Sequence, residues 1–486
     1  MLKPVAIEKN EAAGADAAPT SAGRWALASL CLSLLLSSLG TSIANVALPT
    51  FAQVFAASFQ QVQWIVLAYL LAITTLIVSV GRLGDVVGRR RLLLAGIALF
   101  TATSVLCGIA PTLSLLIAAR AAQGLGAAVM MALTIAFVSE IVPKARTGSA
   151  MGLLGTMSAV GTASGPSLGG MLIAAFGWRA IFFVGVPLGL LAFGLAYRYL
   201  PTERRASGTA RVGFDRLGTL LLALTLAAYA LAMTSGRGQF GLFNIGLLLA
   251  AAVGAVLFVL IEARAQSPLI RLRVFRDPQL SASLVTNMLV ATVIMTTFVV
   301  GPFYLARALG LDAAMVGLVM STGPIVSALS GVVAGRIVDR LGARFMIVAG
   351  LIGMAAGSLA LSMLPAMFGT AGYIASITIL SPGYQLFQAA NNTVVMVDVG
   401  PDQRGVISGM LSLSRNLGLI TGASVMGAVF AFASGTANVA AAQPQAVTTG
   451  MQITFAVAAM LIVVAVAIAV GSRVLVKRAS PAANAT

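Results

Sequence analysis

The sequence predicts an all-α integral membrane protein whose chain crosses the bilayer fourteen times. Of its 486 residues, 59% are hydrophobic and only 9% are charged, whereas soluble domains carry about 25% charged residues. Apolar runs of about twenty residues, each long enough to cross a bilayer as a helix, recur along the whole chain. The runs are too long for barrel strands, and open strands leave backbone groups unsatisfied in lipid. A bundle of membrane helices follows.

The ends of the predicted spans coincide with residues that suit turns and membrane interfaces. Trp25, Trp64 and Trp178 fall at span ends, where their amphipathic rings anchor in the interface. Prolines stand at or near many of the turns, because a missing N–H costs least there. The expected spans are 25–47, 62–81, 92–110, 113–141, 148–173, 180–199, 217–234, 242–262, 281–306, 312–333, 345–363, 368–397, 406–432 and 451–472.

Basic residues predict the orientation of the chain. If residues 1–23 are a disordered cytoplasmic tail, 25 of the 30 Lys and Arg residues fall on cytoplasmic segments, 3 fall outside and 2 fall within spans. Cytoplasmic loops of membrane proteins carry such an excess. We therefore expect a multi-pass protein of the inner (plasma) membrane with both termini, including the tail 476–486, in the cytoplasm. The same rule explains the net charge of +17 without a nucleic-acid partner.

A repeat divides the chain into two halves. The glycine-rich charged stretch 81–91 links spans two and three, and a weaker copy at 335–344 links spans ten and eleven. The sequence therefore predicts a six-helix half at 24–200, two inserted helices with their loops at 201–280, and a second six-helix half at 281–475. The equivalent pairs, each 254 positions apart, are Gly81 and Gly335, Arg82 and Arg336, Asp85 and Asp339, Gly88 and Gly342, and Arg90 and Arg344.

Three motifs carry a resemblance to a known family. They are the stretch 81–91, the stretch from Arg120 to Gly124 with Gln123, and the glycine-rich stretch 161–170, supported by Asn-Val-Ala-Leu-Pro at 45–49. With these residues the chain resembles the fourteen-span drug:proton antiporters of the major facilitator superfamily, which export drugs and toxic organic compounds. The resemblance implies a major facilitator fold, alternating access, proton-coupled efflux of small amphipathic molecules, and a monomer in the membrane lipid.

The stretch 81–91 is expected to reverse the chain tightly, since glycine permits positive φ and close helix approach. Asp85 is expected near the start of span three, where the helix dipole favours a carboxylate. Topology alone can explain the surrounding arginines. The resemblance implies in addition a conformational latch against the other half, weaker in the second copy. The candidate latch residues are Gly81, Arg82, Asp85, Gly88, Arg89, Arg90, Asp339 and Arg344.

Arg120 is a candidate functional residue because it lies inside a predicted span. An arginine at a helix centre costs roughly 2.5–3.5 kcal/mol on insertion scales, so it needs a water-filled cavity or polar partners. Gln123 lies one turn further along the same face. The resemblance implies that Arg120 takes part in proton transfer, and the alternative is that its side chain extends to the outer interface.

Small residues form one face of span five. Gly161, Gly165 and Gly169 recur at every fourth position, with Pro166 and Gly170 beside them. Such spacing lets a second helix approach closely, and packing alone explains it. In the family that the chain resembles, this glycine and proline face marks antiporters and acts as a hinge or a seal.

Polar stripes in apolar spans of both halves predict a central substrate cavity, because transporters bind substrate between their repeats. Interhelical packing through amides is the alternative. The candidate cavity residues are Thr41, Asn45, Gln123, Gln385, Gln388, Asn391, Asn392 and Arg415.

One position departs from the family pattern. Similar antiporters carry an acidic residue in span one where this chain has Gly40. None of the 13 acidic residues lies in mid-span, and the chain has no histidine. The candidates for proton coupling are therefore Arg120, Asp85 and Glu140, and neutral, zwitterionic or anionic cargo is as well supported as cationic dyes.

The sequence thus favours a secondary transporter that exports small organic molecules in exchange for protons. Two alternatives stay open: a dedicated exporter or uncoupled facilitator for one metabolite or antibiotic, and a membrane sensor or enzyme. Without histidine, and with both cysteines inside apolar runs, we expect no metal site, no cofactor and no catalytic centre.

Overall fold

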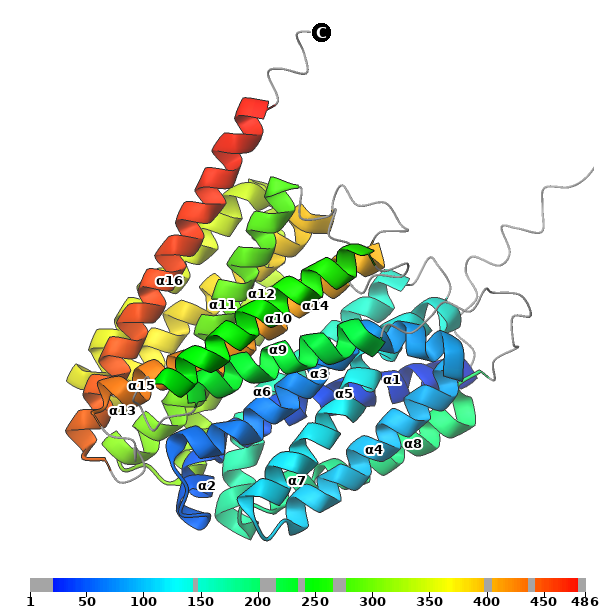
Figure 1. Cartoon of the computed structure of the whole chain (residues 1–486), viewed down its shortest axis with the longest axis horizontal. Helices are drawn as coiled ribbons and strands as arrows, with labels where there is room; N and C mark the ends of the chain where they lie inside the picture. The colour runs from blue at the N-terminus through cyan, green and yellow to red at the C-terminus, as the bar shows by residue number, and fades with distance from the viewer. Residues whose placement is uncertain are drawn as a thin grey trace, which may run out of the picture.

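The computed structural model describes residues 21–142, 147–201, 216–234, 241–264, 277–396, 404–435 and 442–479, and this part of the chain contains helices but no strand. Figure 1 shows the first half, blue to cyan, beside the second half, yellow to red, with a green helix pair along their boundary. The helices of the first half are α1 Ser21–Val46, α2 Leu48–Val54, α3 Phe59–Val87, α4 Arg89–Ile109, α5 Leu113–Ile141, α6 Thr147–Phe176, α7 Ala180–Phe183 and α8 Gly185–Tyr199.

Two helices form the insert and the rest form the second half. The insert consists of α9 Arg216–Thr234 and α10 Leu242–Arg264. Of two short π-helical segments in the second half, η4 extends α11 at its end, and η5 separates α14 from α15. The second half contains α11 Pro278–Phe303, η4 Tyr304–Ala308, α12 Ala313–Leu341, α13 Ala343–Met396, α14 Arg404–Thr421, η5 Gly422–Met426, α15 Gly427–Ala433 and α16 Pro444–Ala479.

Thirteen helices of the described chain are long and apolar enough to cross a membrane. The predicted spans 345–363 and 368–397 are joined in the 54-residue helix α13, whose Gly369 has the non-helical angles φ 55 and ψ −130. The two arms of α13 pack against each other, because a Cβ built at Gly350 would contact the backbone of Phe387. The count of fourteen therefore stays a prediction that depends on treating these arms as separate crossings.

The repeat is visible in the backbone, but the reversal is narrower than the sequence suggested. Helix α3 continues through Val87, so the chain turns at Gly88, whose φ is 102. Its repeat equivalent Gly342, with φ 87, separates α12 from α13 in the same way. The expectation for Asp85 was wrong, because it lies in the last turn of α3 rather than at the start of the next helix. A helix dipole favours cations at that end.

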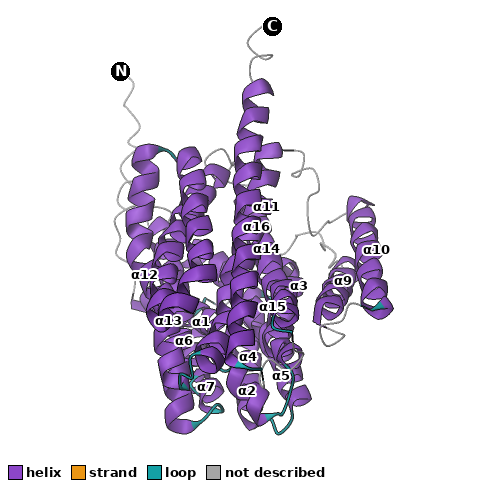
Figure 2. Ribbon diagram, turned by 90° about the vertical axis from the view of Figure 1, so that its left-hand side faces the viewer, coloured by secondary structure: helices purple, strands orange, loops and turns teal. Residues whose placement is uncertain are grey.

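The helices define two ends of the bundle. At one end, here called the terminus end, Trp25 at the start of α1 stacks on Tyr199 at the end of α8. At the other, the α2 end, Phe51 of α2 packs edge-on against Trp178 beside α7, with ring centroids 5.5 Å apart. Figure 2 shows α2 and α7 opposite the point where α16 leaves the bundle. The predicted orientation makes the α2 end extracellular.

The two halves meet at the α2 end through small and aromatic residues. A Cβ at Gly170 of α6 would lie 2.9 Å from the Cα of Gly317 of α12, so only glycine permits this approach. The ring of Phe59 packs edge-on against Phe303 and Phe430, with centroids 4.7 and 5.4 Å away. These contacts between the halves are apolar and involve no charged side chain.

The insert packs along the boundary between the halves. On the first half, the Trp64 indole N–H donates to Thr234 Oγ1 at 3.0 Å. On the second half, the Tyr229 hydroxyl donates to Thr421 Oγ1 at 3.2 Å. Helix α9 makes these bonds, and α10 packs on the outer side of α9, at the edge of the molecule in Figure 2.

The glycine face of α6 packs against α1. A Cβ at Gly161 would meet the backbone of Leu35, and one at Gly169 would lie 2.7 Å from a methyl group of Val46. The hydroxyls of Ser38 and Ser158 share a 2.7 Å hydrogen bond across the same surface. Close packing against α1 therefore accounts for the spacing of Gly161, Gly165 and Gly169, whereas Gly170 faces the second half.

A matched pair of substitutions on α6 tests this packing. We expect Gly165→Val to lower the stability of the protein by roughly 1–3 kcal/mol, the usual cost of overpacking, because its Cβ would collide with Ser42 Oγ. Gly155→Val on the same helix meets nothing within 4 Å and serves as the control. Thermal unfolding in detergent measures the difference, and equal unfolding temperatures would contradict the packing.

Candidate functional site

Arg120 is fully buried in the first half, with 0% of its surface exposed. Its Nε donates to the carbonyl of Ile65 on α3 at 3.1 Å, and its Nη2 donates to the carbonyl of Gly40 on α1 at 2.9 Å. The side chain thus does not extend to the membrane interface, and it binds two neighbouring helices to α5.

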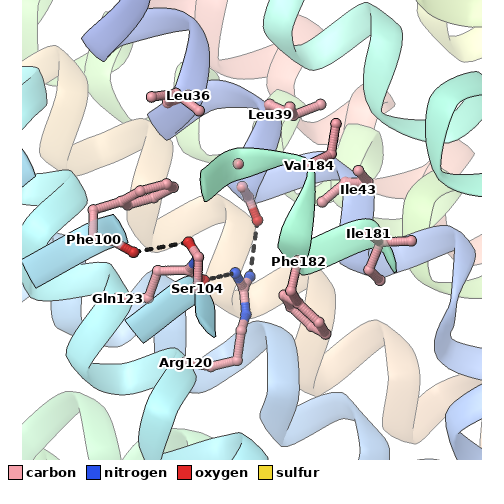
Figure 3. Close-up of a pocket in the computed structure, with 12 residues that line it drawn as sticks. Leu36, Leu39, Ile43, Phe100, Ser104, Arg120, Gln123, Ile181, Phe182 and Val184 are labelled. Atoms are coloured by element: carbon pink, nitrogen blue, oxygen red, sulfur yellow. Dashed lines mark hydrogen bonds between the residues drawn. The ribbon is translucent and has the colours of Figure 1, made fainter. Parts of the chain in front are cut away.

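Gln123 extends this network to α4. Its Oε1 accepts from Arg120 Nη1 at 2.6 Å, and its Nε2 donates to Ser104 Oγ at 2.7 Å. The Ser104 hydroxyl in turn donates to the carbonyl of Phe100 at 2.8 Å, as Figure 3 shows. Gln123 follows Arg120 by three positions, so both side chains lie on one face of α5. The Arg120 cluster, as we call these residues with Tyr69 and the Gly40 carbonyl, therefore joins four helices.

Tyr69 occupies the space beside Gly40, the position at which the resemblance implied an acidic side chain. Its ring centroid lies 4.1 Å from the Arg120 guanidinium carbon, and its hydroxyl donates to the carbonyl of Ser37 at 2.8 Å. A Cβ at Gly40 would approach the Tyr69 hydroxyl to 2.8 Å. An aromatic ring and a main-chain carbonyl thus contact the guanidinium, where a carboxylate was expected from the family pattern.

The candidate acids lie far from Arg120. Asp85 is twenty residues beyond Ile65 on α3, and Glu140 is twenty residues beyond Arg120 on α5. At 1.5 Å per residue, each separation is roughly 30 Å along a helix. The side chains of Asp85 and Glu140 lie outside the described part of the structure. Arg120 and these acids belong to opposite ends of the bundle, so they do not form one site.

A small cavity adjoins the Arg120 cluster. Its volume is about 20 Å³, and α1, α4, α5, α7 and α8 contribute its walls. Figure 3 shows Arg120, Gln123 and Ser104 on its polar side and Leu39, Ile43 and Phe182 on its apolar side. This volume holds one water-sized occupant. The cavity is too small for an organic substrate.

The candidate cavity residues of the two halves do not line one described pocket. Thr41 and Asn45 bond to their own helix, since Asn45 Nδ2 donates to the Thr41 carbonyl at 2.9 Å. Asn391 is fully buried and lines a cavity of about 280 Å³ inside the second half, together with Arg344 and Gln279. On α13, Gln385 and Gln388 are half-buried and Asn392 is exposed, as is Arg415 on α14.

The structure describes the side chains of only some of the candidate latch residues. The side chains of Arg82 and Asp85 lie outside the described part. Arg90 donates to the carbonyl of Tyr197 on α8 at 2.5 Å and lies over its ring, so it contacts its own half. Asp339 and Arg344 are exposed, and Arg344 donates to the Gln279 side chain at 3.4 Å.

Several members of the Arg120 cluster were not identified from the sequence. The carbonyls of Gly40 and Ile65 are main-chain groups, which leave no pattern of residue types. Ser104 follows Thr101 and Thr103 on α4, and nothing in the sequence distinguishes it from these other buried hydroxyl residues. Tyr69 was not among the residues predicted from the sequence, although an aromatic ring is a known partner for a buried guanidinium.

Comparisons with known proteins agree with this fold. Residues 30–423 match the family described as the Major Facilitator Superfamily. The chain is 34% identical over 403 residues to the multidrug resistance protein Stp of Mycobacterium tuberculosis, covering 82% of this chain and 74% of Stp. It is 31% identical over 402 residues to the riboflavin transporter RibZ of Clostridioides difficile, covering 83% and 87%.

A third relative and a solved structure extend the comparison. The multidrug efflux pump LfrA of Mycolicibacterium smegmatis is 31% identical over 422 residues, with 85% of this chain and 81% of LfrA covered. The crystal structure of a bacterial homologue of the human lysosomal transporter Spinster superimposes with a TM-score of 0.70 at 16% identity, over 95% of this chain and 99% of that one. At that identity the likeness concerns the fold.

Proposed function

Because the chain belongs to the Major Facilitator Superfamily, we propose that it exports small amphipathic organic compounds, drugs among them, by alternating access driven by proton influx. Membership makes the chain a transporter and not an enzyme, and its many apolar helices make it a multi-pass membrane protein. The names of the relatives Stp and LfrA support multidrug efflux as the direction and cargo class.

The observation that carries the proposal is the interface between the halves at the α2 end. Phe59, Phe303 and Phe430 pack there across the boundary, and Gly170 meets Gly317. Gln63 Nε2 adds one hydrogen bond to the Ala423 carbonyl at 2.9 Å. An interface of a few aromatic and glycine contacts can open without exposing buried charge, as rocking of two halves around a central site requires.

Proton coupling needs a group whose protonation changes during the cycle. We place this step at Asp85 and Glu140, near the terminus end of the bundle, and the polar candidates on α13 and α14 at the substrate path. Arg120 lies about 30 Å from both acids along the helices. Its proposed part is to hold α1, α3, α4 and α5 together as one rigid unit, while protonation takes place at the other end.

Transport into proteoliposomes under an imposed pH gradient tests the proton coupling. We expect the gradient to speed transport of a fluorescent drug several-fold, because each proton that moves down it drives the cycle. In Asp85→Asn this stimulation should be lost, whereas Asp339→Asn, the repeat equivalent, should keep it. Protein-free liposomes give the background. Equal rates with and without the gradient would rule out coupling and leave a facilitator.

A dedicated exporter of one metabolite or antibiotic is the second candidate. Gly40 favours it, because cationic drugs lose the carboxylate that would attract them inside the first half. The relative RibZ carries the name of a riboflavin transporter, which supports a dedicated exporter as the second candidate. Growth of cells with and without this chain on cationic, neutral and anionic compounds separates the candidates: protection against several unrelated compounds indicates multidrug efflux, and protection against one indicates a dedicated exporter.

A further inference from the structure

The charge of Arg120 has no opposite charge among the side chains that the structure describes. Its contacts are two main-chain carbonyls, the amide of Gln123 and the ring of Tyr69, all of them uncharged. Asp85 on α3 and Glu140 on α5 are acids, but each lies roughly 30 Å away from the Arg120 cluster along its helix axis. A buried ion without a partner of opposite charge carries a large desolvation cost. The cluster therefore satisfies hydrogen bonds around the guanidinium without neutralising it.

The guanidinium also keeps donors for another partner. Arginine has five N–H groups, and three of them are used in the bonds to Ile65, Gln123 and Gly40. Gln123 Nε2 uses one of its two N–H groups for Ser104. Both side chains line the cavity of about 20 Å³ next to Gly40. The polar side of this cavity is thus rich in N–H donors.

The size and the walls of the cavity select the kind of occupant. A volume of about 20 Å³ holds one water-sized particle, so an organic carboxylate or a phosphate does not fit. Leu36, Leu39, Phe100 and Phe182 form the apolar remainder of the walls. A monatomic, weakly hydrated anion matches a small site with donors on one side and hydrocarbon on the other.

We propose that this cavity binds a single chloride ion, held by the remaining N–H groups of Arg120 and Gln123. The ion supplies the negative charge that the described side chains do not. Gly40 is part of the site because it has no side chain to fill the cavity. This proposal concerns the folded state of the first half and does not depend on which cargo is moved or on proton coupling.

The test is a chloride titration of the purified full-length protein in detergent, with gluconate replacing chloride at constant ionic strength. Thermal unfolding is followed for the wild-type chain and for two variants. The variant Tyr69→Phe removes the hydroxyl that would lie nearest to a Cβ at position 40. The nearest atoms to that Cβ are then ring carbons of residue 69, at 3.3 Å, and of Phe100, at 3.4 Å. The double variant Tyr69→Phe/Gly40→Asp adds a carboxylate, which provides a permanent counter-charge in place of the ion.

Chloride should raise the unfolding temperature of the wild-type chain and of Tyr69→Phe along a saturating curve. At ten times the dissociation constant, the folded-to-unfolded ratio increases about elevenfold. The double variant should not respond to chloride and should unfold in gluconate near the temperature of Tyr69→Phe in saturating chloride. A flat titration of the wild-type chain would mean that the cavity holds water and would overturn the proposal. An undiminished response in the double variant would overturn it too, since chloride would then act elsewhere on this basic protein.

Discussion

Replacing Arg120 with methionine is expected to reduce transport at least about tenfold while leaving the protein folded. Methionine keeps most of the volume of the arginine stem, and it removes a buried charge whose desolvation is costly. The variant loses the bonds from α5 to Ile65 and Gly40, however, and bonds from a charged donor contribute about 1.5–3 kcal/mol each. A barrier raised by about 1.4 kcal/mol slows a step tenfold.

Initial transport rates in proteoliposomes and thermal unfolding, measured on the same preparation, check this expectation. Arg120→Lys is the matched control, because lysine keeps the charge and loses the planar fork that reaches three acceptors at once. We expect its rate to fall between those of the wild-type chain and Arg120→Met. If Arg120→Met transports at the full rate, the Arg120 cluster has no part in the cycle and only stabilises the fold.

Gly317→Leu is expected to keep the two halves apart at the α2 end. A Cβ at this position would meet the carbonyl of Pro166 and lie 2.9 Å from the Cα of Gly170, both on the opposite half. Overpacking of this kind costs about 1–3 kcal/mol, which corresponds to a shift of roughly 5- to 150-fold in a conformational equilibrium. Transport should fall in proportion, because the state closed at this end becomes rare.

The state itself is measured by alkylation of a cysteine introduced at Ala313, which lies against Gly170. The native Cys31 and Cys107 are buried, so they contribute little background. Alkylation should be faster in Gly317→Leu than in the otherwise wild-type chain. Gly331→Leu, on the same helix with nothing within 4 Å, should change neither alkylation nor transport. Unchanged alkylation in Gly317→Leu would remove this contact from the conformational change.

Most of the fold could be predicted from the sequence, because membrane helices have a strongly apolar composition. The long apolar runs and the repeat at Gly88 and Gly342 predicted two halves and an insert. The ends of the helices were harder to predict, since hydropathy indicates where a helix leaves the lipid and not where the helix ends. Helix α3 thus continues through charged residues to Val87. The 54-residue helix α13 changes direction at Gly369. The residues on either side of Gly369 do not mark it in the sequence as the point of the turn.

The candidate site could be predicted from the sequence only in part. A spacing of three residues on one helix brought Arg120 and Gln123 together, and the structure joins them at 2.6 Å. The other acceptors are carbonyls, which every residue carries, so no pattern of side chains could identify Gly40 or Ile65. The polar stripes indicated that a helix face is packed, but they did not indicate which helix packs against it. In the structure, Ser38 of α1 faces Ser158 of α6.

Helix α9 is hydrogen-bonded to both halves at once, through Trp64 on one side and Thr421 on the other. A rigid helix cannot follow two bodies that rotate away from each other. Under the proposed alternating access, at least one of these bonds must therefore break and form again in each cycle. We expect the strength of these bonds to enter the activation barrier of that conformational change. The insert is therefore expected to slow turnover, and a chain built from the two six-helix halves alone would lack this effect.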